Sequence, residues 1–211
     1  MRALVIGDIH TESNLLAKAI SHGGAAGVDK ILSVGDIVDG PGDPLACIAQ
    51  LQTHRAAVVR GNHERWVVEG NPMDPFDYPH EALDWLAELP ATVEIATPTG
   101  RVLLGHGIGD NDMLEIDSYT DGYALENLDP LWALIRGGRY RWMLGGHTHR
   151  PMVRTIEGLT IVNAGTLVLD QHPGFVIADF ATGEVEHWRL LPTMTRDGSW
   201  KLGDPDVSWT R

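Results

Sequence analysis

Cysteine, lysine and long apolar runs are scarce in this chain. Cys47 is the only cysteine, so an intrachain disulfide is impossible and nothing indicates an oxidising compartment. Only three residues are lysine and the formal charge is −13, which argues against an extended nucleic-acid surface because such surfaces need clustered cations. No apolar stretch approaches the roughly 20 residues that a membrane span needs, and the chain opens with a strand pattern. We therefore expect no membrane association and a cytoplasmic protein.

Length and composition fit one α/β domain over residues 1–211, with a C-terminal tail at 191–211. With 43% hydrophobic and 21% charged residues, the chain can bury a proper core. Trp200 and Trp209 either pin the tail to the body or face a partner subunit, which leaves a homo-oligomer open.

Five short apolar runs each lead into glycine and a polar side chain. The fragments that follow them are 8–10 (DIH), 35–39 (GDIVD), 61–64 (GNHE), 105–107 (GHG) and 146–149 (GHTH). Such runs are typical of strands buried on both faces, and glycine lets the chain turn sharply as it leaves the strand. Ligands bind beyond the carboxyl ends of strands in open α/β sheets. We therefore expect five strands in one sheet, with their ends converging on one edge.

The polar residues in these fragments predict a site for two divalent metal ions. Carboxylate, imidazole and amide ligands suit Mn, Fe, Zn or Ni better than Ca or Mg, and no thiolate is present for a structural zinc site. We expect an enzyme, with Mn as its activating ion. Two divalent ions would also make the site positive inside an acidic protein, which favours a small anionic substrate.

The order of the fragments resembles the calcineurin-like metallophosphoesterase superfamily, whose motifs run D-x-H, G-D-x-x-D, G-N-H-D/E, a single H and G-H-x-H. The resemblance spans residues 8–149 and is complete in ligand type and order. It implies that one metal ion is held by Asp8, His10, Asp36 and His149. It implies that the second is held by Asn62, His106 and His147, with the Asp36 carboxylate as the bridge.

The same resemblance implies a four-layer α/β/β/α fold, in which a two-sheet β-sandwich is flanked by helices. The residue patterns predict helices at 11–26, 44–54, 81–88 and 124–135. After the last motif, segments 152–156, 160–162, 175–178 and 185–188 are typical of a meander, which we expect to form the second sheet. Segment 163–166 (NAGT) resembles the family's N-P-G-S loop beneath the metals, with an ordinary turn as the alternative.

The resemblance also assigns roles to residues that hold no metal. A metal-bridging hydroxide would attack the phosphorus, and His63 would donate a proton to the leaving oxygen as the general acid. Asp39 would orient His63, although it could simply cap the turn before Gly40. Glu64 is expected to cap a turn or form a salt bridge.

The expected reaction is hydrolysis of small phosphate esters, and phosphodiesters in particular. The Ser/Thr-type phosphatases carry a phosphate-clamping arginine in G-D-x-V-D-R-G, and Gly40 stands in its place here. Arg65 and Arg150 are candidate substrate-binding residues. Each of Arg60, Arg65 and Arg150 stands next to a motif, and a monoester clamp supplied by one of them stays open. The alternatives are a phosphomonoesterase, as in Ser/Thr-type protein phosphatases or dinucleoside polyphosphate hydrolases, and a non-catalytic scaffold such as the retromer subunit of animals that keeps this fold.

Two irregular inserts, 66–80 and 108–123, are typical of binding loops in compact domains. Their aromatic side chains either stack on a nucleobase or anchor the loops to the body of the protein.

Overall fold

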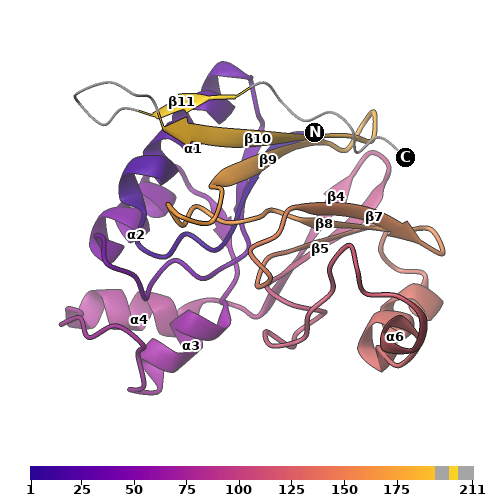
Figure 1. Cartoon of the computed structure of the whole chain (residues 1–211), viewed down its shortest axis with the longest axis horizontal. Helices are drawn as coiled ribbons and strands as arrows, with labels where there is room; N and C mark the ends of the chain where they lie inside the picture. Colours follow the sequence, from indigo (N-terminus) through magenta and orange to yellow (C-terminus); the bar gives the residue numbers. More distant parts are fainter. Residues whose placement is uncertain (193–199, 204–211) are drawn as a thin grey trace.

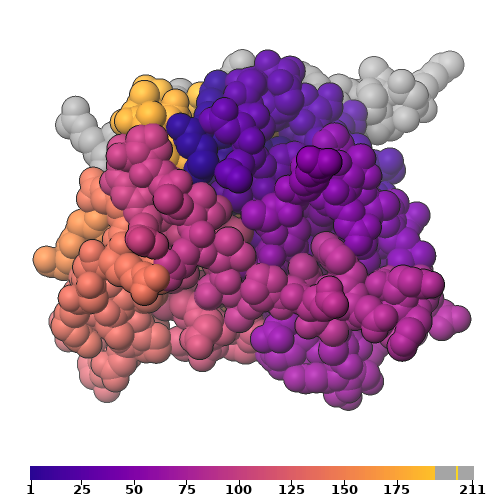
Figure 2. All heavy atoms as spheres, turned by 180° about the vertical axis from the view of Figure 1, so that it is seen from behind, coloured from indigo at the N-terminus to yellow at the C-terminus, as the bar shows by residue number. Residues whose placement is uncertain are grey.

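The computed structural model describes residues 1–192 and 200–203 and has the four layers that the resemblance implies. Two sheets stack face to face, and helices cover their outer faces (Figure 1). On the opposite side of the molecule, magenta residues from the middle of the chain lie between the purple N-terminal part and the orange strands (Figure 2). The predicted fold class is therefore confirmed.

The first sheet has the strand order β11-β10-β9-β1-β2-β3. Its strands are β1 (Arg2–Ile6), β2 (Lys30–Ser33), β3 (Ala57–Val58), β9 (Gly174–Asp179), β10 (Glu184–Pro192) and β11 (Trp200–Leu202). The second sheet has the order β4-β5-β6-β8-β7. Its strands are β4 (Thr92–Thr97), β5 (Gly100–Gly105), β6 (Trp142–Gly145), β7 (Met152–Ile156) and β8 (Leu159–Asn163). The described helices are α1 (Ser13–Ala25), α2 (Pro44–Thr53), α3 (Asn62–Val68), α4 (His80–Glu88), α5 (Gly122–Glu126) and α6 (Asp129–Gly137).

The predicted division of strands between the sheets was wrong. β1, β2 and β3 run parallel in the first sheet, whereas β5 and β6 run parallel in the second. The four later strands divide as well, because β7 and β8 join β6 while β9 and β10 join β1. A continuous apolar run indicates burial on both faces but carries no information about which strand pairs with it.

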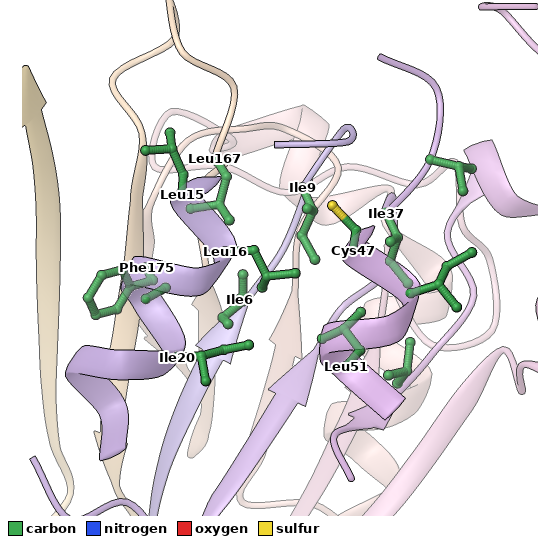
Figure 3. Packing of buried hydrophobic residues seen from close by; sticks show 14 of the residues in the cluster. Ile6, Ile9, Leu15, Leu16, Ile20, Ile37, Cys47, Leu51, Leu167 and Phe175 are labelled. Carbon is green, nitrogen blue, oxygen red and sulfur yellow. The ribbon is translucent and has the colours of Figure 1, made fainter. Parts of the chain in front are cut away.

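Both faces of the central strands are buried, which explains their unbroken apolar character. In β1, Leu4 and Ile6 pack towards the helices, whereas Ala3 and Val5 pack towards the second sheet. Figure 3 shows the helix side, where Leu16 of α1 and other apolar residues of α1 and α2 surround Ile6. The sandwich is thus held by one core between its sheets and two further cores beneath its outer helices.

Cys47 is a small buried residue of α2 within the core of Figure 3. Burial raises the pKa of its thiol to about 12, so the thiolate that reacts or binds metal is disfavoured.

The predicted single helix over 124–135 is two helices, α5 and α6. Pro130 cannot donate the backbone hydrogen bond that a continuous helix would need at that position, and its ring would clash with the preceding turn. The chain therefore leaves helical geometry at Leu128 and starts again with proline in the first turn, where no donor is required.

The predictions also missed α3 and β4. The insert expected to be irregular over 66–80 begins inside α3, which starts at Asn62 within the motif itself. A seven-residue helix has too few residues to show a periodic pattern, and the bonds of its buried Glu64 stabilise it from outside the segment.

The C-terminal region is described only in part. β10 runs into the expected tail and ends at Pro192, and β11 pairs with it in antiparallel orientation. The side chains of Trp200 and Trp209 lie outside the described residues. Within the described part of the chain, no helix is both long and apolar enough to span a membrane. The single-domain organisation and the cytoplasmic location stay predictions.

Candidate metal centre

The candidate ligands follow strands of both sheets, and the backbone that presents them is strained. Positive φ values occur at six of these polar residues, namely Asp8 (48°), His10 (42°), Asp36 (52°), Asp39 (56°), His147 (69°) and His149 (58°). Side chains other than glycine rarely adopt this conformation, and it persists where surrounding contacts over-determine it. Ten described non-glycine residues have positive φ, and six of these ten are the polar residues of this one site.

The first group of potential ligands combines Asp8, His10, Asp36 and His149, whose ligand atoms lie within 4.8 Å of one another. The Nε2 atoms of His10 and His149 are 3.2 Å apart, and His149 Nε2 lies 3.3 Å from Asp8 Oδ1. Two imidazole nitrogens and two carboxylates thus face one point, and this donor set fits a divalent transition-metal ion.

The second group consists of Asp36, His106 and His147, again within 4.8 Å of one another. His106 Nε2 lies 3.2 Å from Asp36 Oδ2 and 3.0 Å from Asn62 Oδ1. The amide oxygen of Asn62 therefore adds a fourth potential ligand. Asp36 belongs to both groups, as a bridging carboxylate must.

In His106 and His10, hydrogen bonds to backbone oxygens use Nδ1 and leave Nε2 available as a metal ligand. His106 Nδ1 donates to Val34 O at 2.7 Å, and His10 Nδ1 donates to Asp39 O at 2.7 Å. A carbonyl oxygen only accepts, so each neutral ring carries its proton on Nδ1 and its lone pair on Nε2. The same backbone contacts fix the ring orientation, which is how protein groups commonly support metal-binding histidines.

Asp36 and His106 form a buried ion pair. Burial by itself would raise the pKa of Asp36, but His106 outweighs it and holds that pKa well below its usual range. Burial would lower the pKa of His106, and the Asp36 carboxylate instead raises it to about 10. A metal ion bound by His106 would have to displace this proton, since only the neutral ring is a ligand.

Glu64 holds the loop that presents Asp36. Its fully buried carboxylate accepts hydrogen bonds from Ile37 N at 2.6 Å and Val38 N at 3.2 Å through Oε1. Its Oε2 accepts from Asp36 N and Gly61 N, each at 2.8 Å. Burial raises the pKa of Glu64, whereas these backbone donors oppose that rise. The expected capping role is confirmed, but the three bonds to the Asp36 loop were not foreseen.

Gly61 allows this loop to approach the start of α3. A Cβ at Gly61 would collide with Asp36 Oδ1 and lie 2.7 Å from Asp36 N. The residue after Asn62, His63, donates its backbone N–H to the same Asp36 Oδ1 at 3.0 Å. Glycine is therefore required by contact at this position, since its φ of −91° suits any residue.

His63 lies beside both ligand groups. Its Nδ1 is 2.9 Å from Asp39 Oδ2, and its Nε2 is 3.9 Å from Asp36 Oδ2. The ring packs edge-on between His10 and Trp66, with centroid distances of 4.6 and 4.7 Å. The Asp39 carboxylate therefore contacts the imidazole of His63 directly.

Asp39 also ties the 66–80 insert to this site. Its carboxylate accepts from Met73 N at 3.1 Å and from Asp74 N at 3.4 Å. Met73 is 68% exposed and Phe76 is 41% exposed, so this insert presents apolar side chains to solvent.

Both candidate substrate-binding arginines are engaged with the other insert. Arg65 donates from Nε and Nη2 to the two oxygens of Asp112 at 2.8 and 3.0 Å. Arg150 Nη1 lies 3.3 Å from Asp117 Oδ2.

Segment 163–166 forms hydrogen bonds to the loops that carry Asp8 and His147. Thr166 Oγ1 donates to Asp8 O at 2.7 Å, and the Asn163 amide donates to Gly146 O and to Thr148 Oγ1. The expected likeness to a loop beneath the metals thus agrees with its position, and alanine in place of the family's proline leaves the bracing bonds intact.

Comparison with known proteins agrees with the fold and the ligand pattern. The Calcineurin-like phosphoesterase superfamily domain matches residues 1–183. The uncharacterized protein MJ0912 of Methanocaldococcus jannaschii is 24% identical over 193 residues, covering 85% of this chain and 75% of that protein.

Solved structures share the architecture at low sequence identity. A metallophosphoesterase from Sphaerobacter thermophilus has a TM-score of 0.66 and 23% identity, covering 90% of this chain and 87% of its own. An archaeal phosphodiesterase has a TM-score of 0.57 and 16% identity, covering 90% of this chain and 100% of its own. These likenesses concern the fold.

Asp36→Asn is expected to leave less than the full metal complement, because a neutral amide bridges two cations poorly and both ligand groups contain Asp36. Elemental analysis of purified protein after dialysis measures this. Asp39→Asn is the control, since its side chain lies outside both groups and its backbone carbonyl still orients His10. Equal metal content in the two variants would contradict the shared position of Asp36.

Glu64→Gln is expected to lower the free energy of unfolding by about 1–3 kcal/mol, because one side-chain N–H₂ would then face buried backbone N–H groups. Urea unfolding measures the loss. Glu69→Gln, one turn later on an exposed side chain, should change it by less than about 0.5 kcal/mol. Similar values for both variants would show that the four bonds of Glu64 add no stability.

Proposed function

Because the chain belongs to the calcineurin-like phosphoesterase superfamily and is a metal-dependent hydrolase, we propose that it hydrolyses small phosphate esters, and phosphodiesters in preference to monoesters. The observation that carries the proposal is the convergence of two ligand groups on Asp36, with His63 beside them. A non-catalytic scaffold would not need two groups of carboxylate and imidazole ligands, each within 4.8 Å, that share one carboxylate.

Two divalent ions, with Mn as the activating species, would occupy the two groups. Asp8, His10, Asp36 and His149 would hold one ion, and Asn62, His106 and His147 would hold the other together with Asp36. Bound ions of this kind supply Lewis acidity towards phosphoryl oxygens and lower the pKa of water. The buried carboxylates and the neutral imidazoles would fix the positions of the two ions, and thereby the place at which phosphoryl oxygens bind.

His63 is the proposed general acid. The leaving oxygen of an ester needs a proton as its bond to phosphorus breaks, and imidazole is a suitable donor near neutral pH. Asp39 accepts from Nδ1 and directs Nε2 towards the ligand groups, because the carboxylate is itself held by two backbone N–H groups.

The preference for diesters follows from a missing cation. A phosphomonoester carries up to about two negative charges, and an arginine fork is the usual additional partner. A Cβ at Gly40 would collide with His10 O and lie 2.6 Å from Thr11 Oγ1, so no arginine could replace this glycine without a backbone shift. A diester carries one charge, and its second ester group could lie along the exposed side chains of Met73 and Phe76 in the 66–80 insert. The archaeal protein with the same fold is itself a phosphodiesterase.

His63→Ala is expected to keep its metal content and to lower kcat by about 10²–10⁴-fold, the usual contribution of a positioned general acid. The loss should be large for alkyl or nucleoside esters and small for nitrophenyl esters, whose anion leaves without a proton. Steady-state kinetics across such a leaving-group series measures the difference. A uniform loss across the series would instead assign His63 to electrostatic stabilisation of the phosphate.

The wild-type protein in Mn²⁺ is expected to cleave bis-nitrophenyl phosphate with a kcat/KM about tenfold above that for nitrophenyl phosphate. The reason is that Arg65 and Arg150 are both engaged by carboxylates of the 108–123 insert, whereas a free arginine fork would add charge-assisted bonds worth about that factor for the monoester. A clear preference for the monoester would reject the diester assignment while leaving the phosphoesterase assignment in place.

A further inference from the structure

The 108–123 insert brings acidic side chains to the metal centre, where Glu115 Oε1 lies 3.5 Å from His147 Nε2. It contains five acidic residues and neither lysine nor arginine. Its backbone packs directly on the ligand loop, because a Cβ at Gly107 would collide with Asn111 O and lie 2.7 Å from Leu114 O. Ile108 and Ile116 are buried in the core beneath α6. The buried isoleucines and the backbone contacts at Gly107 therefore fix the position of the insert next to the metal centre.

One of these carboxylates, that of Asp112, takes the Nε–Nη2 edge of the Arg65 guanidinium. Arg65 is 27% exposed and Asp112 14% exposed, and two parallel bonds of 2.8 and 3.0 Å join them. Arg65 lies in α3, one turn after Asn62, and Asp112 lies against the residue that follows His106. The pair therefore connects the same two elements as the 3.0 Å contact between Asn62 and His106.

The other side of the centre has a similar arrangement. Arg150 follows the ligand candidate His149, and its guanidinium lies 3.3 Å from Asp117. Glu115 Oε1 lies 3.5 Å from His147 Nε2. Arg65 and Arg150 thus each face a carboxylate of the insert, although Arg150 is 67% exposed and its pair is weaker in water.

We infer that Asp112 is a positioning residue that determines specificity: it keeps the Arg65 fork from binding the extra oxygen and charge of a phosphomonoester. This inference rests on the proposed phosphoesterase function. A dianionic phosphate could use the Nε–Nη2 edge of Arg65 only by replacing two charge-assisted bonds that already match this edge in geometry. The Asp112 carboxylate also offsets the positive charge that the remaining N–H groups of Arg65 would offer. A diester needs no such exchange. Substrate choice is then set by the insert as well as by Gly40.

The test compares the monoester-to-diester ratio of kcat/KM in metal-loaded, full-length variants. Asp112→Asn is expected to raise the ratio of nitrophenyl phosphate to bis-nitrophenyl phosphate about tenfold, since it frees the Arg65 fork. The double variant R65M/D112N should return the ratio to its wild-type value. A merely structural role for Asp112 would lower both rates together and leave the ratio unchanged.

Glu69→Gln is the matched control. Glu69 also faces Arg65, at 3.6 Å from Nη1, but it is 53% exposed and leaves the fork on Asp112. Its removal should keep the ratio within about twofold of the wild type.

Calorimetry with inorganic phosphate gives a second reading that does not depend on turnover. Asp112→Asn should bind phosphate about tenfold more tightly than the wild type, and the double variant should not. Circular dichroism verifies folding, and Asp112→Ser replaces Asp112→Asn in every comparison if the latter does not fold.

Two failures are distinguishable. A wild type that cleaves neither ester with Mn, Fe, Ni or Zn would overturn the proposed function. A wild type that cleaves the diester, with a ratio and phosphate affinity unchanged by Asp112→Asn or retained in the double variant, would overturn only the role of Asp112.

Discussion

The carboxylate of Glu64 is the contact on which the geometry of the metal centre depends. It gathers backbone N–H groups from the loop after β2 and from the start of α3, two segments that are 23 or more residues apart in sequence. Without the Glu64 carboxylate, these backbone N–H groups would be buried without an acceptor. Asp36 would also lose the hydrogen bond to its backbone N–H that supports its positive φ. Because Asp36 belongs to both ligand groups, one buried side chain orients the whole site.

Much of the site could be predicted because its chemistry is local in sequence. Each candidate ligand stands just after a short apolar run, so residue type and strand end together indicated a site for two metal ions. The division of the ligands between the two ions came from the family resemblance. Contacts that depend on tertiary structure gave no such signal. The bonds of Asp39 to Met73 and Asp74 depend on how the insert folds back, and the fork between Arg65 and Asp112 joins segments 47 residues apart.

The fold was predictable in its layers and unpredictable in its pairings. β9 lies beside β1 with Val176 opposite Val5, yet both strands are apolar on both faces and could pair with many others. The division of one expected helix at Pro130 had a signal in the sequence, because proline restricts the turn before it. The short α3 had none, since bonds to the Asp36 loop support it from outside the helix.

The ligand groups draw on both sheets: Asp8 and Asp36 follow strands of the first, and His106 and His147 follow strands of the second. Bound ions would therefore link the two sheets of the sandwich to each other. Binding to the native state alone stabilises it by mass action, which ties folding to the supply of metal in the cell. Protein without bound metal would be inactive, and its lower free energy of unfolding would expose it to degradation. The amount of this protein would therefore follow the fraction that carries metal and is active.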